Sequence, residues 1–490
     1  MRRVIVQTAT CIVALCLLSI SQALAQQGGL AEKYSAAMLQ DAILEPQDWV
    51  PYPKPDEADE WQRLLPQGKV DALIKNAEQY LGWDWPLAKA SVFLDYVRNG
   101  NRTRFENIHF ARRLALVALV MGELVEGEGR FMDDIANGVW AISEETFWGN
   151  QGGARLQKRG AGLADVNDPV VDLFAAQTAQ ILAWTSYLMA DGLDAVHPMI
   201  RERIYTETDR RIFKVIESKP GYRWTGAPQD IDDPTLSYER KSFLQRRPNN
   251  WNPWIGSNLL ISILLLEQDK ERRADFVHQV FGYLDNYLGP HPPDGGSDEG
   301  TGYWGHAAGS TFECFDIVYM ATGGAFDEFG QPLIINMGEF ITKAYIGNGY
   351  YVNFADASPK PSHSPMLVYR FGKAVGSKVM MTMGAHLAAQ MDFENAVPQG
   401  RSLQRNLPEL LFTRELLGIE AAEPDIVFLL PEIAEPAQVV HENQQRRGVG
   451  RGVVAAALDL VGNLRNHRRG RRIDDGDRIG HRPQHRLPIG

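Results

Sequence analysis

The chain has 490 residues, 44% of them hydrophobic, and a formal net charge of −11 at pH 7. Residues 441–490 hold 11 Arg against 5 acidic residues, so this stretch carries +6 and residues 1–440 carry −17. An acidic body disfavours general nucleic-acid binding, and no nucleic-acid partner is expected.

The first 25 residues have the features of a secretory signal. Arg2 and Arg3 form a basic start, a largely apolar stretch follows, and Ala23-Leu24-Ala25 fits a small-residue cleavage site. We therefore predict a signal peptide over residues 1–25 and export to the periplasm or the extracellular space. No later segment has the uninterrupted apolar length of a membrane span, so none is expected.

Removal of the signal would also remove two of the three cysteines, Cys11 and Cys16. Cys314 would then stand alone, so no internal disulfide could form. Because Phe312 and Phe315 flank it, we expect a buried structural cysteine and not a nucleophile. The remaining chain must be stabilised by a hydrophobic core, which a body of about 400 residues is long enough to build.

Residues 26–430 are predicted to be mostly helical. Arg104–Glu126 is a long helix whose middle is apolar almost all round, so it should be buried. Asp168-Pro169 predicts a helix start, with a capping acid and then a proline at the first helical position. Apolar residues at helical spacing from Val277 to Leu288 predict another helix, which Gly289-Pro290 ends.

Further helices are expected at 67–81, 131–146, 198–217, 254–267, 309–321 and 333–346. Sustained period-2 alternation is absent before residue 345. Short connections between helices favour antiparallel neighbours. We therefore predict a mostly α fold, an (α/α) toroid of antiparallel helical hairpins.

Three polar clusters interrupt this pattern, and the first lies at the start of the helix expected at 254–267. An asparagine before a helix is ordinarily a cap, but three in four positions exceed that need. Amide donors and arginines at a helix N-terminus suit a carboxylate or sulfate, and tryptophans suit stacking on a sugar ring. The cluster comprises Arg246, Arg247, Asn249, Asn250, Trp251, Asn252 and Trp254.

The second cluster is a loop, residues 291–306, with five glycines and three acids in sixteen residues. It offers Tyr303 and His306 as proton-transfer groups. Glycine-rich loops carry function when a rigid scaffold holds them, although the same residues could serve only to pack and hydrogen-bond within the loop.

The third cluster, residues 143–153, ends a helix in an aromatic stretch and then a polar, glycine-rich turn. It contains Glu145 and Trp148. An ordinary helix C-terminus explains it equally well, since glycine commonly follows a helix.

Together these stretches resemble the heparinase II/III-type polysaccharide lyases, from about residue 93 to about residue 431. The strongest matches are Glu-Glu-Thr-Phe-Trp at 144–148, Asn-Asn-Trp-Asn-Pro-Trp at 249–254, Asp-Gly-Gly-Ser-Asp-Glu-Gly-Thr-Gly-Tyr-Trp at 294–304 and Tyr-Val-Asn-Phe-Ala-Asp at 351–356. The motifs are specific for the superfamily but not for one substrate.

The resemblance implies an N-terminal (α/α) toroid, a C-terminal β-sandwich and β-elimination on a uronic-acid polysaccharide. It implies that Asn250 neutralises the sugar carboxylate and that Tyr303 is the catalytic tyrosine. Trp251 stands where the family often has a histidine base, and His306 is the nearest substitute by sequence. Substrate contacts are expected from Arg246, Arg247, Asn249, Trp251, Asn252, Trp254 and Glu299, with Trp148 and Glu145 lining the cleft.

The tail, residues 431–490, departs from the family. The 62 residues after Phe428 contain no aromatic residue. We weigh three explanations: a basic tail for an anionic partner, a disordered extension, or a shifted reading frame. The family's sandwich domain supplies a His- and Asn-rich segment, often around a structural metal, and nothing like it follows residue 431. The toroid itself is expected to need no metal or cofactor. Because the sandwich domain is expected to be missing, the activity of the chain is expected to be impaired.

Two other functions remain open at this stage. A glycoside hydrolase on the same toroid would draw an acid and a base from Asp294, Asp298 and Glu299. A non-catalytic remnant would bind an acidic glycan without turnover. The sequence leaves the polysaccharide, its linkage, endo or exo action and the oligomeric state undecided.

Overall fold

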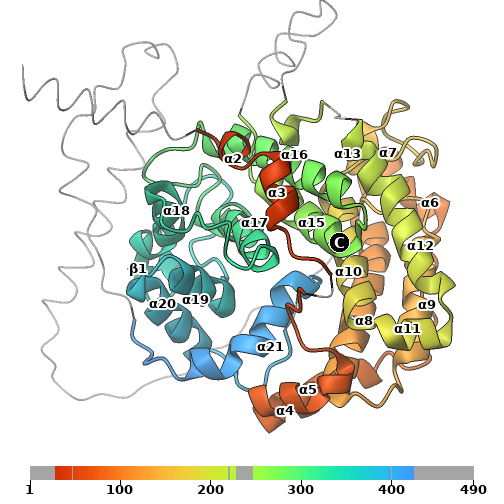
Figure 1. The fold of residues 1–490 in the computed structure, drawn as a ribbon, viewed down its shortest axis with the longest axis horizontal. Helices are drawn as coiled ribbons and strands as arrows, with labels where there is room; N and C mark the ends of the chain where they lie inside the picture. Colours follow the sequence, from red (N-terminus) through yellow and green to blue (C-terminus); the bar gives the residue numbers. More distant parts are fainter. Residues whose placement is uncertain (1–27, 47, 219–220, 228–246, 399, 424–490) are drawn as a thin grey trace, which may run out of the picture. The chain divides into compact units, whose positions relative to one another are not determined.

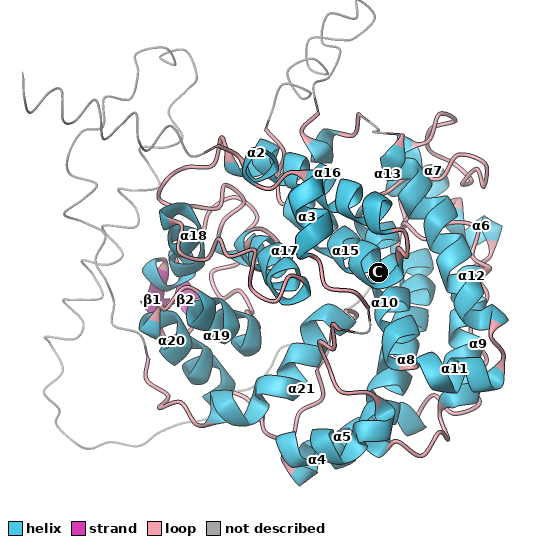
Figure 2. Cartoon of the chain, in the orientation of Figure 1, coloured by secondary structure: helices cyan, strands magenta, loops and turns pink. Residues whose placement is uncertain are grey.

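The computed structural model describes residues 28–46, 48–218, 221–227, 247–398 and 400–423 (Figure 1). The expected signal peptide, Arg246 and the tail over 431–490 lie outside these residues. The described part is mostly helical, as predicted, with one two-stranded antiparallel ribbon, β1 (Tyr345–Gly347) and β2 (Tyr350–Tyr351) (Figure 2). None of the described helices is both long and apolar enough to cross a membrane.

The helices of the first half are α2 (Leu30–Lys33), α3 (Ala36–Ala42), η1 (Pro55–Glu57), α4 (Ala58–Leu64), α5 (Gln67–Glu78), α6 (Ala90–Phe93), α7 (Asp95–Asn99), α8 (Thr103–Glu126), α9 (Met132–Ser143), η2 (Gly153–Leu156), α10 (Leu173–Leu188), α11 (Ala190–Val196), α12 (Met199–Thr208), the π-helical turn η3 (Asp209–Phe213) and α13 (Lys214–Glu217). Those of the second half are η4 (Arg223–Thr225), α15 (Trp251–Leu266), α16 (Lys270–Leu288), η5 (Thr301–Tyr303), α17 (Ala308–Ala321), α18 (Pro332–Lys343), α19 (Pro365–Ala374), α20 (Lys378–Ala389) and α21 (Leu403–Leu417).

Seven of these helices contact one another in an order that returns to its starting point. The successive packing pairs are α8 with α10, α10 with α15, α15 with α17, α17 with α19, α19 with α21, α21 with α4, and α4 with α8. Other helices pack beside members of this series: α5 and α9 beside α8, α16 beside α15, and α18 and α20 beside α19 (Figure 1).

Two helices carry most of the apolar length of the core. In α8 every residue from Ala115 to Val125 is buried, and α15 is buried from Ile255 to Leu264. A helix that is apolar on all sides is stable only when neighbours enclose it, because apolar area removed from water contributes about 25 cal/mol per Å². Cys314 is fully buried on α17, as its apolar neighbours predicted.

Most expected helices are present within a few residues of their predicted ends, but three predictions need correction. The helix expected from Asp168 begins at Leu173, because Asp172 is the capping acid and accepts from the N–H groups of Phe174 and Ala175. The Asp168 carboxylate instead accepts from the backbone N–H of Lys158 and holds a loop.

The other two corrections concern the division of one predicted helix and the end of another. The stretch 198–217 is divided into α12, η3 and α13, and its π-helical turn carries Arg211, whose guanidinium donates to three carbonyls of residues 143–146. The stretch 333–346 ends as helix at Lys343, because Tyr345 begins the ribbon.

Two leucines of α8 give a matched test of this core. Leu119→Ala should lower the free energy of unfolding by about 2–5 kcal/mol, because Leu119 is completely buried and its loss leaves a cavity. Leu114→Ala, on the same helix but 36% exposed, should change it by about 0.5 kcal/mol or less. Urea denaturation followed by circular dichroism measures both, and equal losses would contradict the burial of this helix.

Candidate functional site

The asparagine-rich helix start and the glycine-rich loop meet through one carboxylate. Asn249 Nδ2 donates to Oε1 of Glu299 at 3.1 Å, and Asn250 Nδ2 donates to Oε2 of the same side chain. Asn250 is the N-cap residue of α15, and its carbonyl accepts from the N–H of Trp254 at 3.1 Å. Two amides from the start of one helix therefore hold a single carboxylate of the loop.

A second contact joins the same two segments, one helical turn after Asn250. The His306 ring stacks on Trp254, with ring centroids 3.8 Å apart and an interplanar angle of 19°. Tyr303 lies beside His306, at 6.3 Å between ring centroids, and its carbonyl accepts from the His306 N–H. We call Asn249, Asn250, Trp254, Glu299, Tyr303 and His306 the Asn250 cluster.

Two glycines allow the loop to reach this position. Gly295 has φ +75° and Gly300 has φ +81°, a region that favours glycine. A Cβ on Gly300 would lie 2.4 Å from the Phe354 carbonyl oxygen, and one on Gly295 would lie 2.3 Å from the backbone carbon of Asn336. The loop is therefore held tightly against residues 336 and 354.

An arginine that the sequence analysis did not single out fixes the far end of the loop. Arg405, on α21, donates through Nη2 to the Gly305 carbonyl at 2.7 Å and to Ser310 Oγ at 3.2 Å. It also pairs with the buried Glu313 at 2.8 Å. Because Gly305 directly precedes His306, Arg405 positions the histidine.

Burial and charge act on both ionisable ends of the cluster. Burial raises the pKa of the Glu299 carboxyl, the donation from Asn249 opposes this, and the acids Asp298 and Asp356 add to the rise. Burial, with the positive charges of Arg405 and Arg401, lowers the pKa of His306 to about 3. At neutral pH His306 is therefore uncharged, but a base with so low a pKa has little driving force to remove a proton.

Two other residues expected to bind substrate have structural partners instead. Asn252 is buried and donates to the carbonyls of Trp224 and Tyr283, both at 2.7 Å, so its amide hydrogens are already used within the fold. Arg247 pairs with Asp298 at 3.0 Å and is only partly exposed. Trp251 is half-buried against the core.

The third sequence cluster is also structural. Trp148 is 1% exposed, its Nε1 donates to the Ile142 carbonyl, and the Arg211 guanidinium lies 4.8 Å from its ring, so the side chain is held by contacts within the fold. The Glu145 carboxylate pairs with Arg113 at 2.6 Å and with Arg112 at 2.8 Å. The sequence cannot reveal this, because both arginines lie more than thirty residues earlier.

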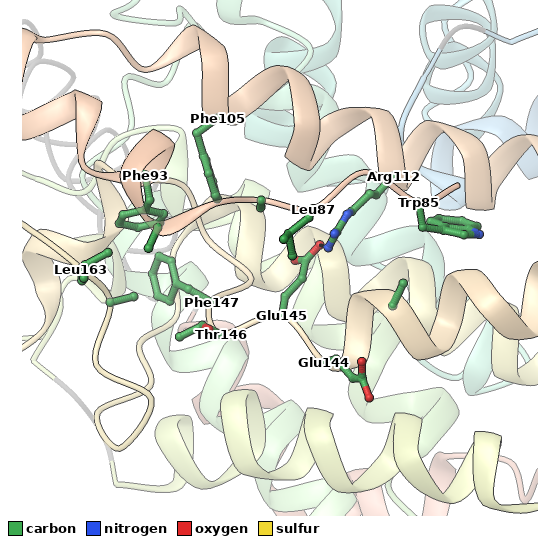
Figure 3. A pocket seen from close by; sticks show the side chains of 14 residues that line it. Trp85, Leu87, Phe93, Phe105, Arg112, Glu144, Glu145, Thr146, Phe147 and Leu163 are labelled. Atoms are coloured by element: carbon green, nitrogen blue, oxygen red, sulfur yellow. Dashed lines mark hydrogen bonds and ion pairs between the residues drawn. The ribbon is translucent and has the colours of Figure 1, made fainter. Parts of the chain in front are cut away.

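A pocket of about 510 Å³ lies beside this ion pair (Figure 3). Figure 3 shows Arg112 and Glu145 side by side at one wall and the rings of Phe93, Phe105 and Phe147 at another. Glu145 is one of the residues that line this pocket. None of the residues that line this pocket belongs to the Asn250 cluster, so the predicted site residues divide between two places.

Within the described ranges, no three His, Cys, Asp or Glu side chains lie close enough to hold a metal ion. Neither a family model nor a curated protein sequence matches the chain. The case for a function therefore rests on the geometry of the Asn250 cluster and on the chemistry of its side chains.

Replacing Glu145 tests its structural role. Glu145→Ala should lower the free energy of unfolding by about 3–5 kcal/mol, because it leaves two buried guanidinium groups without their carboxylate. Glu144→Ala, at the exposed neighbouring position, should change it by about 0.5 kcal/mol or less. Chemical denaturation measures the free energy of unfolding of both variants, and similar losses would argue against the ion-pair assignment.

The depressed pKa of His306 predicts a pH dependence of stability. The unfolded chain, with an ordinary histidine pKa of about 6.5, binds a proton between pH 6.5 and 3 that the folded chain does not. The stability of the wild type should therefore fall relative to that of His306→Gln as the pH drops from 7 to 4. Urea titrations at three pH values measure this difference, and parallel curves would show that folding does not lower the pKa of His306.

Proposed function

We propose that this protein is an exported polysaccharide lyase that cleaves an acidic, uronic-acid-containing polysaccharide by β-elimination. The observation that carries the proposal is the pair of amides, Asn249 and Asn250, that together hold a carboxylate of the loop on which Tyr303 and His306 also lie. In the free protein that carboxylate belongs to Glu299. A sugar carboxylate would engage the same donors when Glu299 turns away.

The chemistry of elimination explains why such donors are needed. The C5 proton of a uronate is too weakly acidic to leave while the neighbouring carboxylate keeps its full charge. An amide donor such as Asn250 withdraws that charge and stabilises the enolate that forms when the C5–H bond breaks.

The proton then has to reach the leaving oxygen. The electron pair of the C5–H bond forms the C4=C5 double bond, and the C4–O4 bond breaks. Tyr303 would act as a phenolate: its oxygen would accept the C5 proton, and the phenol so formed would donate a proton to the leaving O4, which restores the phenolate. Trp254, stacked on His306, would offer the apolar face of its ring to the sugar.

The packing order of the helices supports an (α/α) toroid as the scaffold. The seven-helix series returns from α21 through α4 to α8, as a closed ring of helices requires. The Asn250 cluster lies on two members of the series, at the start of α15 and just before α17.

The hydrolase alternative gains less support, because each acid of the loop already has a partner. Asp298 pairs with Arg247, Asp294 accepts from the Gly296 N–H, and Glu299 accepts from two asparagines. A hydrolase needs one carboxyl group free to protonate the leaving oxygen and another free to act on water or on the sugar.

Product analysis with a tyrosine variant tests the proposal. The full chain should release products with a conjugated C4=C5 double bond, detected by ultraviolet absorbance, from an alginate-type or a heparan-type polysaccharide. Tyr303→Phe should lower kcat by about 10²- to 10⁴-fold, because it removes the proton carrier. Tyr319→Phe, at an exposed position on α17, serves as the control and should leave the rate unchanged.

Two outcomes would contradict the lyase. New reducing ends without the double bond would indicate a hydrolase. Binding of the polysaccharide without turnover, unchanged in Tyr303→Phe, would indicate a non-catalytic glycan-binding protein.

A further inference from the structure

Arg401 lies just before α21. It is a charged side chain that takes no part in the contacts described for the Asn250 cluster. Its guanidinium carbon lies 3.6 Å from the centroid of the Phe110 ring, and the side chain is half-buried. Among the described residues it has no hydrogen-bond acceptor and no ion-pair partner. Arg405, one helical turn later, uses its guanidinium on three neighbours.

Such an arrangement leaves donors that an anion can use. A guanidinium carries five N–H donors, and on a ring it is held ready to pair with an oxyanion. Glu106 is the acid whose charge acts on Arg401. This charge raises the pKa of Arg401, but burial lowers that pKa more strongly. The Glu106 carboxylate, however, already pairs with Arg102 at 2.7 Å and accepts from Asn150 at 3.1 Å. The donors of Arg401 therefore remain available to a ligand.

A row of rings connects Arg401 to the Asn250 cluster. Phe110, under the guanidinium, lies 5.0 Å from Phe174, and Phe174 lies 6.4 Å from Trp254, between ring centroids. Trp254 in turn stacks on His306. All three rings are partly exposed, and they come from the successive helices α8, α10 and α15. Partly exposed aromatic rings in a row suit the apolar faces of consecutive sugar units.

We propose that Arg401, stacked on Phe110, binds an oxyanion on a sugar unit next to the one whose carboxylate Asn250 holds. The oxyanion is a carboxylate or a sulfate ester, since a planar guanidinium pairs with either through two parallel hydrogen bonds. This inference rests on the proposed function for the identity of the ligand as a glycan. It narrows the substrate class to chains that carry a negative charge on neighbouring units.

Binding measurements separate this subsite from the elimination chemistry. Dissociation constants are measured by calorimetry for the full chain carrying Tyr303→Phe, which prevents consumption of the ligand. The probes are three tetrasaccharides: an unsulfated uronate, a sulfated uronate from heparin, and a neutral glucan. Arg401→Ala should bind the acidic probes about 10- to 100-fold more weakly, the range for a lost charge-assisted hydrogen bond. The neutral probe should be unaffected.

Two further variants make the result specific. Arg401→Lys should lose less than Arg401→Ala, because it keeps the charge but not the planar fork. Arg155→Ala, at an exposed arginine, should bind all probes as before. A loss confined to the sulfated probe would identify the oxyanion as sulfate, and a loss on both acidic probes would identify it as carboxylate.

The inference and the proposed function can fail separately. Unchanged affinity of Arg401→Ala for both acidic probes, or an equal loss on the neutral one, would overturn the subsite even if the wild type forms unsaturated products. A charge-specific loss together with no unsaturated product would leave the subsite standing and overturn the lyase. Absence of binding to every probe by the parent protein would overturn both.

Discussion

The site depends on the complete enclosure of α15. Ten consecutive residues of this helix are buried, and it packs against α10, α16 and α17. A helix enclosed in this way can present only its ends to a ligand, and its N-terminus is where the amides of Asn249 and Asn250 lie. The same packing sets where Trp254 meets His306, so the apolar interior of α15 determines the position of the polar groups at its start.

Glu299 gives the amide pair two roles. In the free protein its carboxylate satisfies donors that would otherwise lie partly buried without an acceptor, which is costly. Under the proposed function, a ligand carboxylate would have to displace this internal one, so its net affinity would be the difference between two similar interactions. Such competition favours a ligand that brings additional contacts, and the row of rings leading to Arg401 offers them.

The sequence predicts those parts of the structure that depend on neighbouring residues. The long apolar stretches predict α8 and α15, and Gly289 ends α16 where expected. The resemblance of the motifs brought Asn250 and Tyr303 into one hypothesis, and the structure places both segments side by side.

The features that the sequence does not predict depend on contacts between residues that are far apart in the chain. Trp148 and Asn252 have the residue types of a sugar site, but burial, which local sequence does not encode, makes them structural. Glu145 belongs with arginines of α8. Arg401 and Arg405 follow no local pattern at all, because their neighbours lie about 100 to 300 residues earlier.

The hydrogen bond from Arg405 to the Gly305 carbonyl has a consequence for the order of assembly. A ribosome completes the loop and α17 long before it reaches α21, so the carbonyl waits for its donor during the synthesis of a hundred residues. Contacts over such separations form late, because the entropy of closing the intervening chain must be overcome first. The helical hairpins can therefore form early, while the geometry around His306 is completed only by one of the last described helices.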